Sequence, residues 1–545
     1  MDDLRQKITD LALSDALKHG SANSKSVLGK LLGTNPALRD KIPQIRELIE
    51  EIILEVNNLT IDKITQLAPK PIVKSKKKEE KSLPPLEENK APVFRFAPGP
   101  SGPLHLGHTR AISLNAEYRD IYNGKLILRI EDTNPNAIDK DAYDLIPKEM
   151  EWLDAKPDEI FIQSDRMDIY YDDIKTLLAS GHAYVSFTPA EEWRDLKRKS
   201  KSDNYRNLPS KVQLDAFDKL LIDGSGIVVI KTDLEDPNPA LRDFVAFRVV
   251  EDKHPRQGLK YRLWPTYNFA VSIDDYRLGI THVLRGKDHL NNTERQKWIY
   301  KYMKWKEPYF IHYGLVSMPD TLLKTSEIKK RISEGIYEGW DDCQLATVQA
   351  LSKRGFKSKA IRKFWINGGI KEVDITFSWS NLEAVNKSII DSTSKRLFFV
   401  PNPIPFSFET PSEIEKSAPL HPDIPEWGVR SETISSESKI YLSKEDISSL
   451  KMGTVFRLKN LCNVTFHDDK LVYHGVDNIK GISILQWVSD KNISLSLHYS
   501  DGTKIDGLVE DQAISHIQET VQFERLGFAT LNGSKANLNA FYLHK

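Results

Sequence analysis

Apolar side chains recur with the period of a helix in the first part of the chain. Between residues 42 and 56 they return every three or four positions, and acidic and basic side chains fill the opposite face. The apolar positions are Ile42, Ile45, Leu48, Ile49, Ile52, Ile53 and Val56. The pattern predicts a small helical appendage over residues 1–70.

Residues 71–92 show no such period and have the composition of a linker. They contain a lysine-rich run at residues 74–78 and the adjacent prolines Pro84 and Pro85. The basic run could contact nucleic acid. A solvated linker is the favoured interpretation, because runs of like charge usually lie in solvent.

From residue 93 the pattern changes to alternating strands and helices. Strand-like runs at residues 93–97 and 125–130 alternate with helix-like runs at residues 106–122 and 143–153, and a short strand follows at residues 160–162. Alternation of this kind predicts a parallel sheet covered by helices. Such a sheet binds nucleotides at the carboxyl ends of its strands, so the fold class is α/β.

Later segments depart from this alternation. Residues 186–260 combine a basic helix, expected at residues 191–201, with short β segments. Strand–helix alternation resumes over residues 261–318, with a strand expected at residues 280–285 and a helix at residues 293–303.

The last third of the chain changes from helical to β-rich. Residues 319–385 are mainly helical in pattern. Residues 386–545 contain short strands separated by Ser, Pro and Gly turns, which predicts one or two β-barrels.

Composition limits the classes of protein that this chain can belong to. Its 545 residues are too many for one core, and 40% hydrophobic and 28% charged residues are typical of soluble proteins. Basic and acidic residues both number 77, so nucleic-acid contacts must come from local basic patches. Cys343 and Cys462 provide no disulfide framework and no zinc motif. Without a long apolar run or a signal peptide, we expect a cytoplasmic protein with no membrane contact.

The turn in residues 95–108 is the strongest candidate for a nucleotide site. A short strand is followed by a Gly/Pro turn and by His105-Leu-Gly-His108 at the expected start of a helix. A helix N-terminus offers unpaired N–H groups and a favourable dipole to phosphate. Gly102 and Gly107 permit close approach of a ligand, and His105 and His108 could donate to phosphate oxygens as pyrophosphate leaves.

Three motifs carry a resemblance to class I aminoacyl-tRNA synthetases. His105-Leu-Gly-His108 is similar to their HIGH signature, and Arg129-Ile-Glu-Asp-Thr133 and Leu284-Arg-Gly-Lys-Asp-His-Leu290 resemble the glutamyl branch, its archaeal form in particular. The resemblance implies a Rossmann-type catalytic domain in two halves, residues 93–185 and 261–318. It further implies an acceptor-stem-binding insertion at residues 186–260, a stem-contact region at residues 319–385 and an anticodon-binding β-barrel region at residues 386–545.

The resemblance also implies an activity and the residues that recognise the amino acid. Family members activate glutamate with ATP and transfer it to the 3′ end of tRNA(Glu). Arg285 matches the arginine that meets the substrate's side-chain carboxylate, and Arg95 and Tyr267 match residues that assist it. Glu131 matches the residue that receives the substrate ammonium, and Asn268 lies in the substrate-contacting segment.

Many bacterial relatives have serine at the position of Gly99 and asparagine at that of Val271. Contacts from those side chains are therefore missing, and Asn268 is a candidate to compensate.

The second signature of the family, KMSKS, has an altered counterpart here. Lys324-Thr-Ser-Glu327 preserves the first lysine and the serine, so Lys324 and Ser326 are catalytic candidates and Lys324 a candidate ATP ligand. Glu327 replaces the later lysine, and a carboxylate facing triphosphate would be repulsive. Either Glu327 points away and Lys324, Lys329 or Lys330 serves, which is the favoured reading, or activity is weak.

The remaining expectations concern metals, RNA and assembly. Mg²⁺ should arrive with ATP. No structural zinc is expected, because Ser186 and Thr188 stand where some relatives have cysteines. A basic cluster beside Trp193 could follow an acceptor stem, although a solvated helix face is nearly as plausible. The cluster is Arg194, Lys197, Arg198, Lys199 and Lys201. We expect a monomer, and the charging of tRNA(Gln) stays open.

Parts of the sequence are compatible with three other functions. A glutaminyl enzyme is disfavoured by Arg285, because a buried guanidinium facing a neutral amide would lack its charge partner. A small-molecule nucleotidyltransferase would not need the insertion and the β-rich tail. A non-charging tRNA-binding paralogue is suggested by Glu327 and opposed by four intact residues, His105, His108, Glu131 and Arg285.

Overall fold

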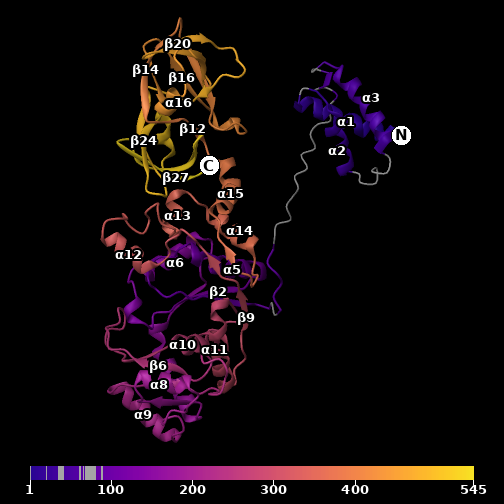
Figure 1. Ribbon diagram of the computed structural model, residues 1–545. Helices are drawn as coiled ribbons and strands as arrows, with labels where there is room; N and C mark the ends of the chain where they lie inside the picture. Colours follow the sequence, from indigo (N-terminus) through magenta and orange to yellow (C-terminus); the bar gives the residue numbers. More distant parts are fainter. Residues whose placement is uncertain are drawn as a thin grey trace. The chain divides into compact units, whose positions relative to one another are not determined.

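The computed structural model describes residues 2–19, 21–34, 42–60, 63–64, 67, 82–87 and 90–545. These residues form two compact units, Met1–Glu80 and Lys81–Lys545 (Figure 1). Most of the expected linker, including the lysine-rich run at residues 74–78, lies outside the described residues. No helix in the described residues is long and apolar enough to cross a membrane.

The first unit is helical, as the apolar period predicted. It contains α1 (Asp2–His19), α2 (Ser24–Thr34) and α3 (Ile42–Asn57). The stripe on α3 is buried through Ile45, Ile49, Ile52 and Val56, which pack with apolar residues of α1 and α2. Burial of one face therefore holds the three helices together.

The C-terminal end of the expected linker packs on the second unit. Leu83 and Leu86 are buried within its core. The Leu86 N–H donates to the Tyr122 hydroxyl over 3.0 Å, and the Tyr118 hydroxyl donates to the Pro84 carbonyl over 2.9 Å. This segment is therefore anchored to the domain that follows it.

The two segments expected to form a Rossmann-type domain have a parallel α/β arrangement. Their strands and helices are β1 (Val93–Phe96), α5 (Leu106–Tyr122), β2 (Lys125–Ile130), α6 (Ala142–Trp152), β3 (Glu159–Ile162), β8 (His282–Gly286), α11 (Leu290–Met303) and β9 (Tyr309–Tyr313). β1, β2 and β3 pair in parallel, as do β8 and β9. The Thr281 N–H donates to the Val93 carbonyl over 3.0 Å and brings β8 beside β1. Strand order therefore runs from β1 to β2 and β3 on one side, and from β8 to β9 on the other. The boundary between β1 and β8 is the switch point, the place where α/β sheets bind ligands.

Residues between these halves form a separate antiparallel sheet. It consists of β4 (Ala183–Ser186), β5 (Ile227–Ile230), β6 (Phe244–Val249) and β7 (Leu263–Pro265), with α8 (Ala190–Arg198) and α9 (Ser210–Ile222). Its core continues into α7 (Met167–Ala179) and α10 (Tyr267–Arg277). The predicted basic helix is shorter than expected, because the backbone turns left-handed at Ser200 (φ 57°).

A helical region connects the parallel α/β part to the β-rich region. It contains α12 (Thr325–Ser333), α13 (Val348–Arg354), α14 (Ser358–Gly368) and α15 (Trp379–Ile390), with β10 (Val316–Ser317) paired to β11 (Ile375–Thr376). The expected start of the β-rich region at residue 386 falls inside α15. Leu382, Asn386 and Ile390 are buried at helical spacing there and extend the helix.

The C-terminal region contains two curled, half-barrel sheets of seven strands each, drawn in orange to yellow in Figure 1. The first consists of β12 (Arg396–Leu397), β25 (Thr520–Phe523), β26 (Gly527–Ser534), β27 (Asn537–His544), β23 (Asn492–His498), β24 (Lys504–Glu510) and β13 (Phe399–Pro401). The second consists of β21 (Ile484–Leu485), β18 (Val455–Leu458), β19 (Asn463–His467), β20 (Lys470–Gly475), β14 (Pro403–Glu409), β17 (Lys439–Ser443) and β22 (Val488–Ser489).

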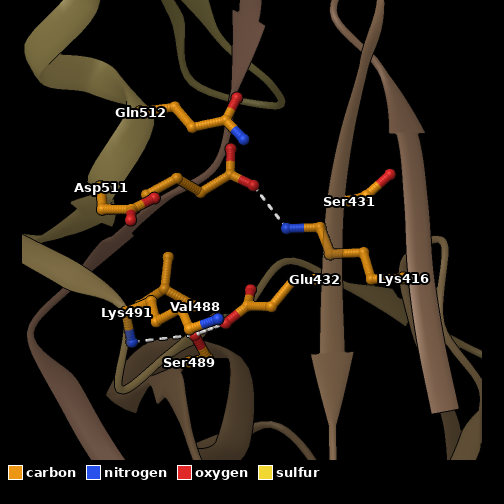
Figure 2. A pocket seen from close by; sticks show the side chains of 9 residues that line it. Lys416, Ser431, Glu432, Val488, Ser489, Lys491, Asp511 and Gln512 are labelled. Atoms are coloured by element: carbon orange, nitrogen blue, oxygen red, sulfur yellow. Dashed lines mark hydrogen bonds and ion pairs between the residues drawn. The ribbon is translucent and has the colours of Figure 1, made fainter.

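A hairpin joins the two sheets through buried charge. Its strands are β15 (Ile414–Pro419) and β16 (Val429–Ile434). Lys416 and Arg430 on the hairpin both pair with Glu510 of the first sheet. Glu432 accepts a hydrogen bond from Ser489 of the second sheet. The side chains enclose a small polar pocket of about 150 Å³, which Lys416 enters from the hairpin (Figure 2).

Candidate functional site

The two histidines of the first signature cap the helix that they begin. His105 is the N-cap of α5, and its Nδ1 accepts a hydrogen bond from the Gly107 N–H over 3.1 Å. His108 Nδ1 accepts one from the His105 N–H over 3.2 Å. The two rings stack with their centroids 3.8 Å apart. The geometry is a reciprocal capping box built from imidazoles.

This capping determines which ring nitrogens carry protons. Burial lowers the pKa of His105 to about 4 and that of His108 to about 3, so both rings are neutral near pH 7. In each neutral ring Nδ1 is the acceptor, and the proton must therefore sit on Nε2. Each histidine thus presents an N–H donor without carrying a charge.

The expectation of unpaired backbone N–H groups at this helix start is wrong. The Leu106 N–H donates to the Ala346 carbonyl, the Gly107 N–H to the His105 ring and the His108 N–H to the His105 carbonyl. A neighbouring loop, the His105 side chain and the His105 carbonyl each accept one of the three donors. The imidazole Nε2–H groups are the donors that remain for a ligand.

The second signature segment lies directly against the first. A Cβ at Gly102 would lie 2.4 Å from Thr325 Cγ2, so a larger residue at this position would collide with the segment. A Cβ at Gly107 would lie 3.0 Å from His105 Cε1 and 3.6 Å from Leu323 Cδ1. Both glycines therefore allow the two signatures to approach each other.

The charges on the second signature segment are arranged differently from those of the family motif. Glu327 pairs with Arg331 one helical turn later, at 2.6 Å. Lys329 pairs with Asp139 at 3.0 Å, and Lys330 lies 3.7 Å from Glu334. Lys324 is exposed, and no residue in the described part of the chain pairs with its amine. Ser326 is exposed beside it.

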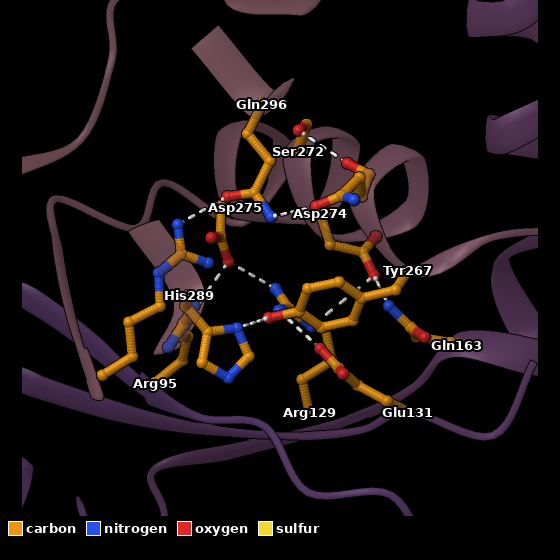
Figure 3. A network of polar contacts seen from close by, with 12 residues as sticks. Arg95, Arg129, Glu131, Gln163, Tyr267, Ser272, Asp274, Asp275, His289 and Gln296 are labelled. Atoms are coloured by element: carbon orange, nitrogen blue, oxygen red, sulfur yellow. Dashed lines mark hydrogen bonds and ion pairs between the residues drawn. The ribbon is translucent and has the colours of Figure 1, made fainter. Parts of the chain in front are cut away.

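A network of arginines and carboxylates lies at the switch point of the sheet (Figure 3). Asp275 of α10 accepts hydrogen bonds from Arg95 Nε at 3.3 Å and Arg129 Nη1 at 2.5 Å. Arg129, fully buried, also donates to Glu131 over 3.0 Å. Burial raises the pKa of Glu131, although Arg129 opposes this. Burial acts in the same direction on Asp275, but Arg95 and Arg129 outweigh it and lower the pKa of that carboxyl.

Arg285 lies in the same region without a carboxylate partner. Its Nη2 donates to Thr293 Oγ1 at 2.6 Å and to Gln296 Oε1 at 2.9 Å. Its Nε and Nη1 are buried and have no hydrogen-bond partner among the described residues. Burial lowers the pKa of this guanidinium. The arrangement leaves a desolvated cation with N–H groups available to an anion.

Tyr267 and Asn268 take part in polar contacts around Arg285, and Tyr267 also interacts directly with this guanidinium and opposes the effect of burial on its pKa. Gln296 donates to Asn268 Oδ1 over 3.2 Å, and Asn268 Nδ2 donates to Asn292 over 3.1 Å. The Tyr267 hydroxyl lies 3.2 Å from His289 Nδ1 (Figure 3). Because both amide atoms of Asn268 are engaged, this side chain supports its neighbours.

The structure adds Asp275, Thr293 and Gln296 to the residues that the sequence suggested. Each lies on a helix and belongs to no signature motif. Two weak signals could have found them: Asp275 interrupts the apolar run of α10, and Thr293 and Gln296 stand three residues apart on one face of α11.

The two positions that differ from bacterial relatives are both accommodated. A Cβ at Gly99 would lie 3.7 Å from the Glu131 carbonyl oxygen, an ordinary contact that leaves room for a small side chain. Val271 is fully buried in the core of α10.

Comparison with known proteins places the chain in a family. Residues 93–392 match the family described as tRNA synthetases class I (E and Q), catalytic domain, and these residues make up more than half of the chain. Residues 394–480 match the anti-codon binding domain of the same class. This chain belongs to the class I tRNA synthetases (E and Q). The resemblance carried by the three motifs is thereby confirmed.

Relatives of this synthetase are similar over nearly their whole length. The Glutamate--tRNA ligase of Thermoplasma acidophilum is 42% identical over 91% of this chain and 91% of that protein. The enzyme of the same name from Methanothermobacter marburgensis is 40% identical over 98% of each, and that from Thermococcus kodakarensis is 39% identical over 100% of each.

A class I synthetase of this group has ATP, an amino acid and tRNA as its partners. In this synthetase the basic cluster expected to face tRNA is partly engaged. Arg198 and Lys199 pair with Asp195, and Trp193 is buried. Burial lowers the pKa of Lys197 to about 8.

The residues that replace possible zinc ligands in this synthetase form a polar cluster. Ser186 and Thr188 both donate hydrogen bonds to the buried carboxylate of Asp203, at 2.5 Å and 3.0 Å. Within the described ranges, no group of three or more His, Cys, Asp and Glu side chains is placed to hold a metal ion.

Proposed function

We propose that this class I synthetase is a glutamate–tRNA ligase. It activates L-glutamate with ATP to glutamyl-adenylate and transfers the glutamyl group to the 3′ end of tRNA(Glu). The observation that carries the proposal is Arg285, a buried cation whose Nε and Nη1 have no partner among the described residues. The names of the three relatives, each at about 40% identity over most of the chain, support it independently.

The proposed amino-acid site places glutamate among the arginines. Its side-chain carboxylate meets Arg285, with Arg95 and Tyr267 beside it, and its ammonium meets Glu131. Asn268 acts behind this layer through Gln296. The guanidinium groups of Arg95, Arg129 and Arg285 carry three positive charges, and the carboxylates of Glu131 and Asp275 carry two negative ones. A ligand of net charge −1 would balance these five groups.

The proposed ATP site lies between the two signatures. His105 and His108 donate through Nε2 to the triphosphate, where charge increases as pyrophosphate leaves. Gly102 and Gly107 provide the close approach, and Lys324 and Ser326 close over the phosphates. Mg²⁺ arrives bound to ATP and is held mostly by phosphate and water oxygens. Glu327 does not oppose the phosphates, because Arg331 neutralises it.

The remaining proposals concern the tRNA contacts, the oligomeric state and the cellular location of the enzyme. The inserted domain contacts the acceptor stem and the two half-barrel sheets contact the anticodon loop. The protein acts as a monomer in the cytoplasm, where translation takes place.

Amino-acid-dependent ATP–pyrophosphate exchange, with and without tRNA, tests the proposal. Aminoacylation of purified tRNA(Glu) and tRNA(Gln) with each amino acid follows. We expect glutamate to be charged onto tRNA(Glu). Charging of glutamine alone would establish the glutaminyl alternative, and tRNA binding without any charging would establish the paralogue. The tRNA(Gln) arm decides whether that tRNA is a second substrate.

A further inference from the structure

Gln296 contacts Arg285, so the side chain at position 296 determines whether the charge of this arginine is neutralised within the amino-acid site. Its side chain is 1% exposed, and its Oε1 accepts a hydrogen bond from Arg285 Nη2 at 2.9 Å. Thr293, one turn earlier on α11, accepts the other Nη2 hydrogen at 2.6 Å. The two acceptors hold the guanidinium through one nitrogen, and its Nε and Nη1 have no hydrogen-bond partner among the described residues.

Both acceptors are neutral, and that is unusual for a buried guanidinium. Arg95 and Arg129 in the same region contact the carboxylate of Asp275. Arg285 instead contacts a hydroxyl and an amide, and the ring of Phe310 lies 5.1 Å from its Cζ. Its orientation is therefore fixed without its charge being neutralised.

The direction of the hydrogen bonds beyond Gln296 follows from the arginine. A guanidinium can only donate, so the amide oxygen of Gln296 must face it and the amide nitrogen must face Asn268 Oδ1. Asn268 Nδ2 then donates to Asn292, which in turn places its own amide nitrogen 3.2 Å from His289 Nδ1. The tyrosine at position 267 shares that same His289 nitrogen. Arg285 and Tyr267 are thus connected by polar contacts that run through Gln296 and meet at the Nδ1 of His289.

We infer that Gln296 is a specificity-determining positioning residue, which orients Arg285 through a neutral acceptor and so reserves its charge for the carboxylate of the amino acid. The inference rests on the proposed glutamate site. A carboxylate at position 296 would satisfy Arg285 internally, and the anionic substrate would then lose its advantage over a neutral amide.

The test compares Gln296→Glu with Gln296→Met. Both variants lose the amide N–H that Gln296 donates to Asn268. The glutamate variant keeps the shape and the acceptor for Arg285 and adds a negative charge, whereas the methionine variant keeps the volume, removes the acceptor and adds no charge. For Gln296→Glu we expect KM for glutamate to rise about tenfold or more with kcat little changed, and the ratio of kcat/KM for glutamate to that for glutamine to fall by a similar factor. For Gln296→Met we expect a smaller rise in KM and a ratio within about threefold of the wild type.

Several outcomes would overturn the inference. Equal losses of kcat/KM for both amino acids in both variants, with an unchanged ratio, would make Gln296 a structural residue. A fall in kcat without a change in KM for glutamate would do the same. Equilibrium binding of tRNA and thermal unfolding of each variant show whether it is folded. If Gln296→Glu does not fold, an unchanged KM for glutamate in Gln296→Met is sufficient to reject the inference.

A failure of the proposed function has a different signature. In that case the wild-type protein itself does not activate glutamate in the presence of tRNA. If the wild type charges glutamate and the two variants behave alike, the proposed function stands and only the role of Gln296 is rejected.

Discussion

Two regions of this protein bury cations, and they satisfy them in different ways. At the junction of the half-barrel sheets, Lys416 and Arg430 both contact the carboxylate of Glu510. At the switch point of the catalytic sheet, Arg285 contacts neutral groups and keeps two nitrogens without partners among the described residues. A buried cation that is paired inside the chain stabilises the fold, whereas one left without a carboxylate is available to a charged ligand.

Replacing Arg285 with alanine should have the largest effect. We expect kcat/KM for glutamate to fall on the order of 10⁴-fold, roughly 5 kcal/mol, because the substrate carboxylate loses its charge partner. Tm and tRNA affinity should hardly change, since no carboxylate of the protein is left unpaired. The matched control is Arg277→Ala. This change removes the ion pair between Arg277, at the end of α10, and Asp173 of α7. A parallel loss of tRNA binding would instead identify Arg285 as structural.

Replacing Glu510 with glutamine should produce the opposite profile. The free energy of unfolding should fall by about 4 kcal/mol, because Lys416 would remain buried without its carboxylate and Arg430 would keep only Glu524, at 3.4 Å. Urea titration measures this, and glutamate-dependent pyrophosphate exchange under folding conditions should be retained. The exposed Glu519→Gln is the control. If Glu510→Gln is as stable as the wild type, the paired cluster does not stabilise the fold and the comparison fails.

Glu149 provides a third case, a buried carboxylate that pairs with no cation among the described residues. Burial raises the pKa of Glu149 from 4.5 to about 7, although the Leu104 N–H and Gln349 donate to it. Because the folded-state pKa is the higher one, the stability from the protonated form is complete below about pH 4.5 and is lost as the pH rises through 7. The loss should reach roughly 3 kcal/mol.

His105 and His108 titrate over the same range with the opposite sign, since burial lowers the pKa of both. The measurement is therefore the difference in unfolding free energy between the wild type and Glu149→Gln, followed from pH 4.5 to 8. We expect the wild type to lose stability relative to the variant over that range. The exposed Glu151→Gln on the same helix should show a flat difference, and a flat difference for Glu149→Gln would contradict the assignment.

The smallest expected effects are on the rate of pyrophosphate exchange, and they compare the unpaired Lys324 with charged groups nearby that have partners. Lys324→Ala should slow pyrophosphate exchange about 30-fold, roughly 2 kcal/mol, because a charge near the leaving phosphates is lost. Lys330→Ala, in the helix that begins after Lys324, is the control, because Lys330 lies 3.7 Å from Glu334. Glu327→Gln should change the rate less than about twofold, because Arg331 already neutralises Glu327 and an exposed pair contributes little. A large gain in rate for Glu327→Gln would show that this carboxylate faces the phosphates.

Sequence patterns predicted the elements that bury one regular face. The helix expected at residues 106–122 has these bounds in α5, because its buried positions recur regularly and Asn123 ends it in a left-handed cap. The start of the β-rich region was misjudged by several residues. Asn386 is polar, but in the structure it is buried against Lys357 and His544 and continues α15.

The candidate site was predictable only where side chains belong to motifs. His105, Glu131 and Arg285 could be named from their segments. The role of Gln296 could not, because a glutamine in the middle of α11 looks like any polar helix position until the fold brings β8 against it. The occupied N–H groups at the start of α5 were equally hidden, since the Leu106 N–H is accepted by Ala346 of a distant loop and the other two by His105.

The reciprocal capping of His105 and His108 has a consequence for each catalytic cycle. Both rings are immobilised by the backbone that begins α5, so their rotational entropy is lost once, when the chain folds. An incoming triphosphate would meet donors that are already aimed and already in one tautomer. The turnover then requires no rearrangement of these groups, and any substitution that frees a ring would slow every cycle even where the new side chain could still donate.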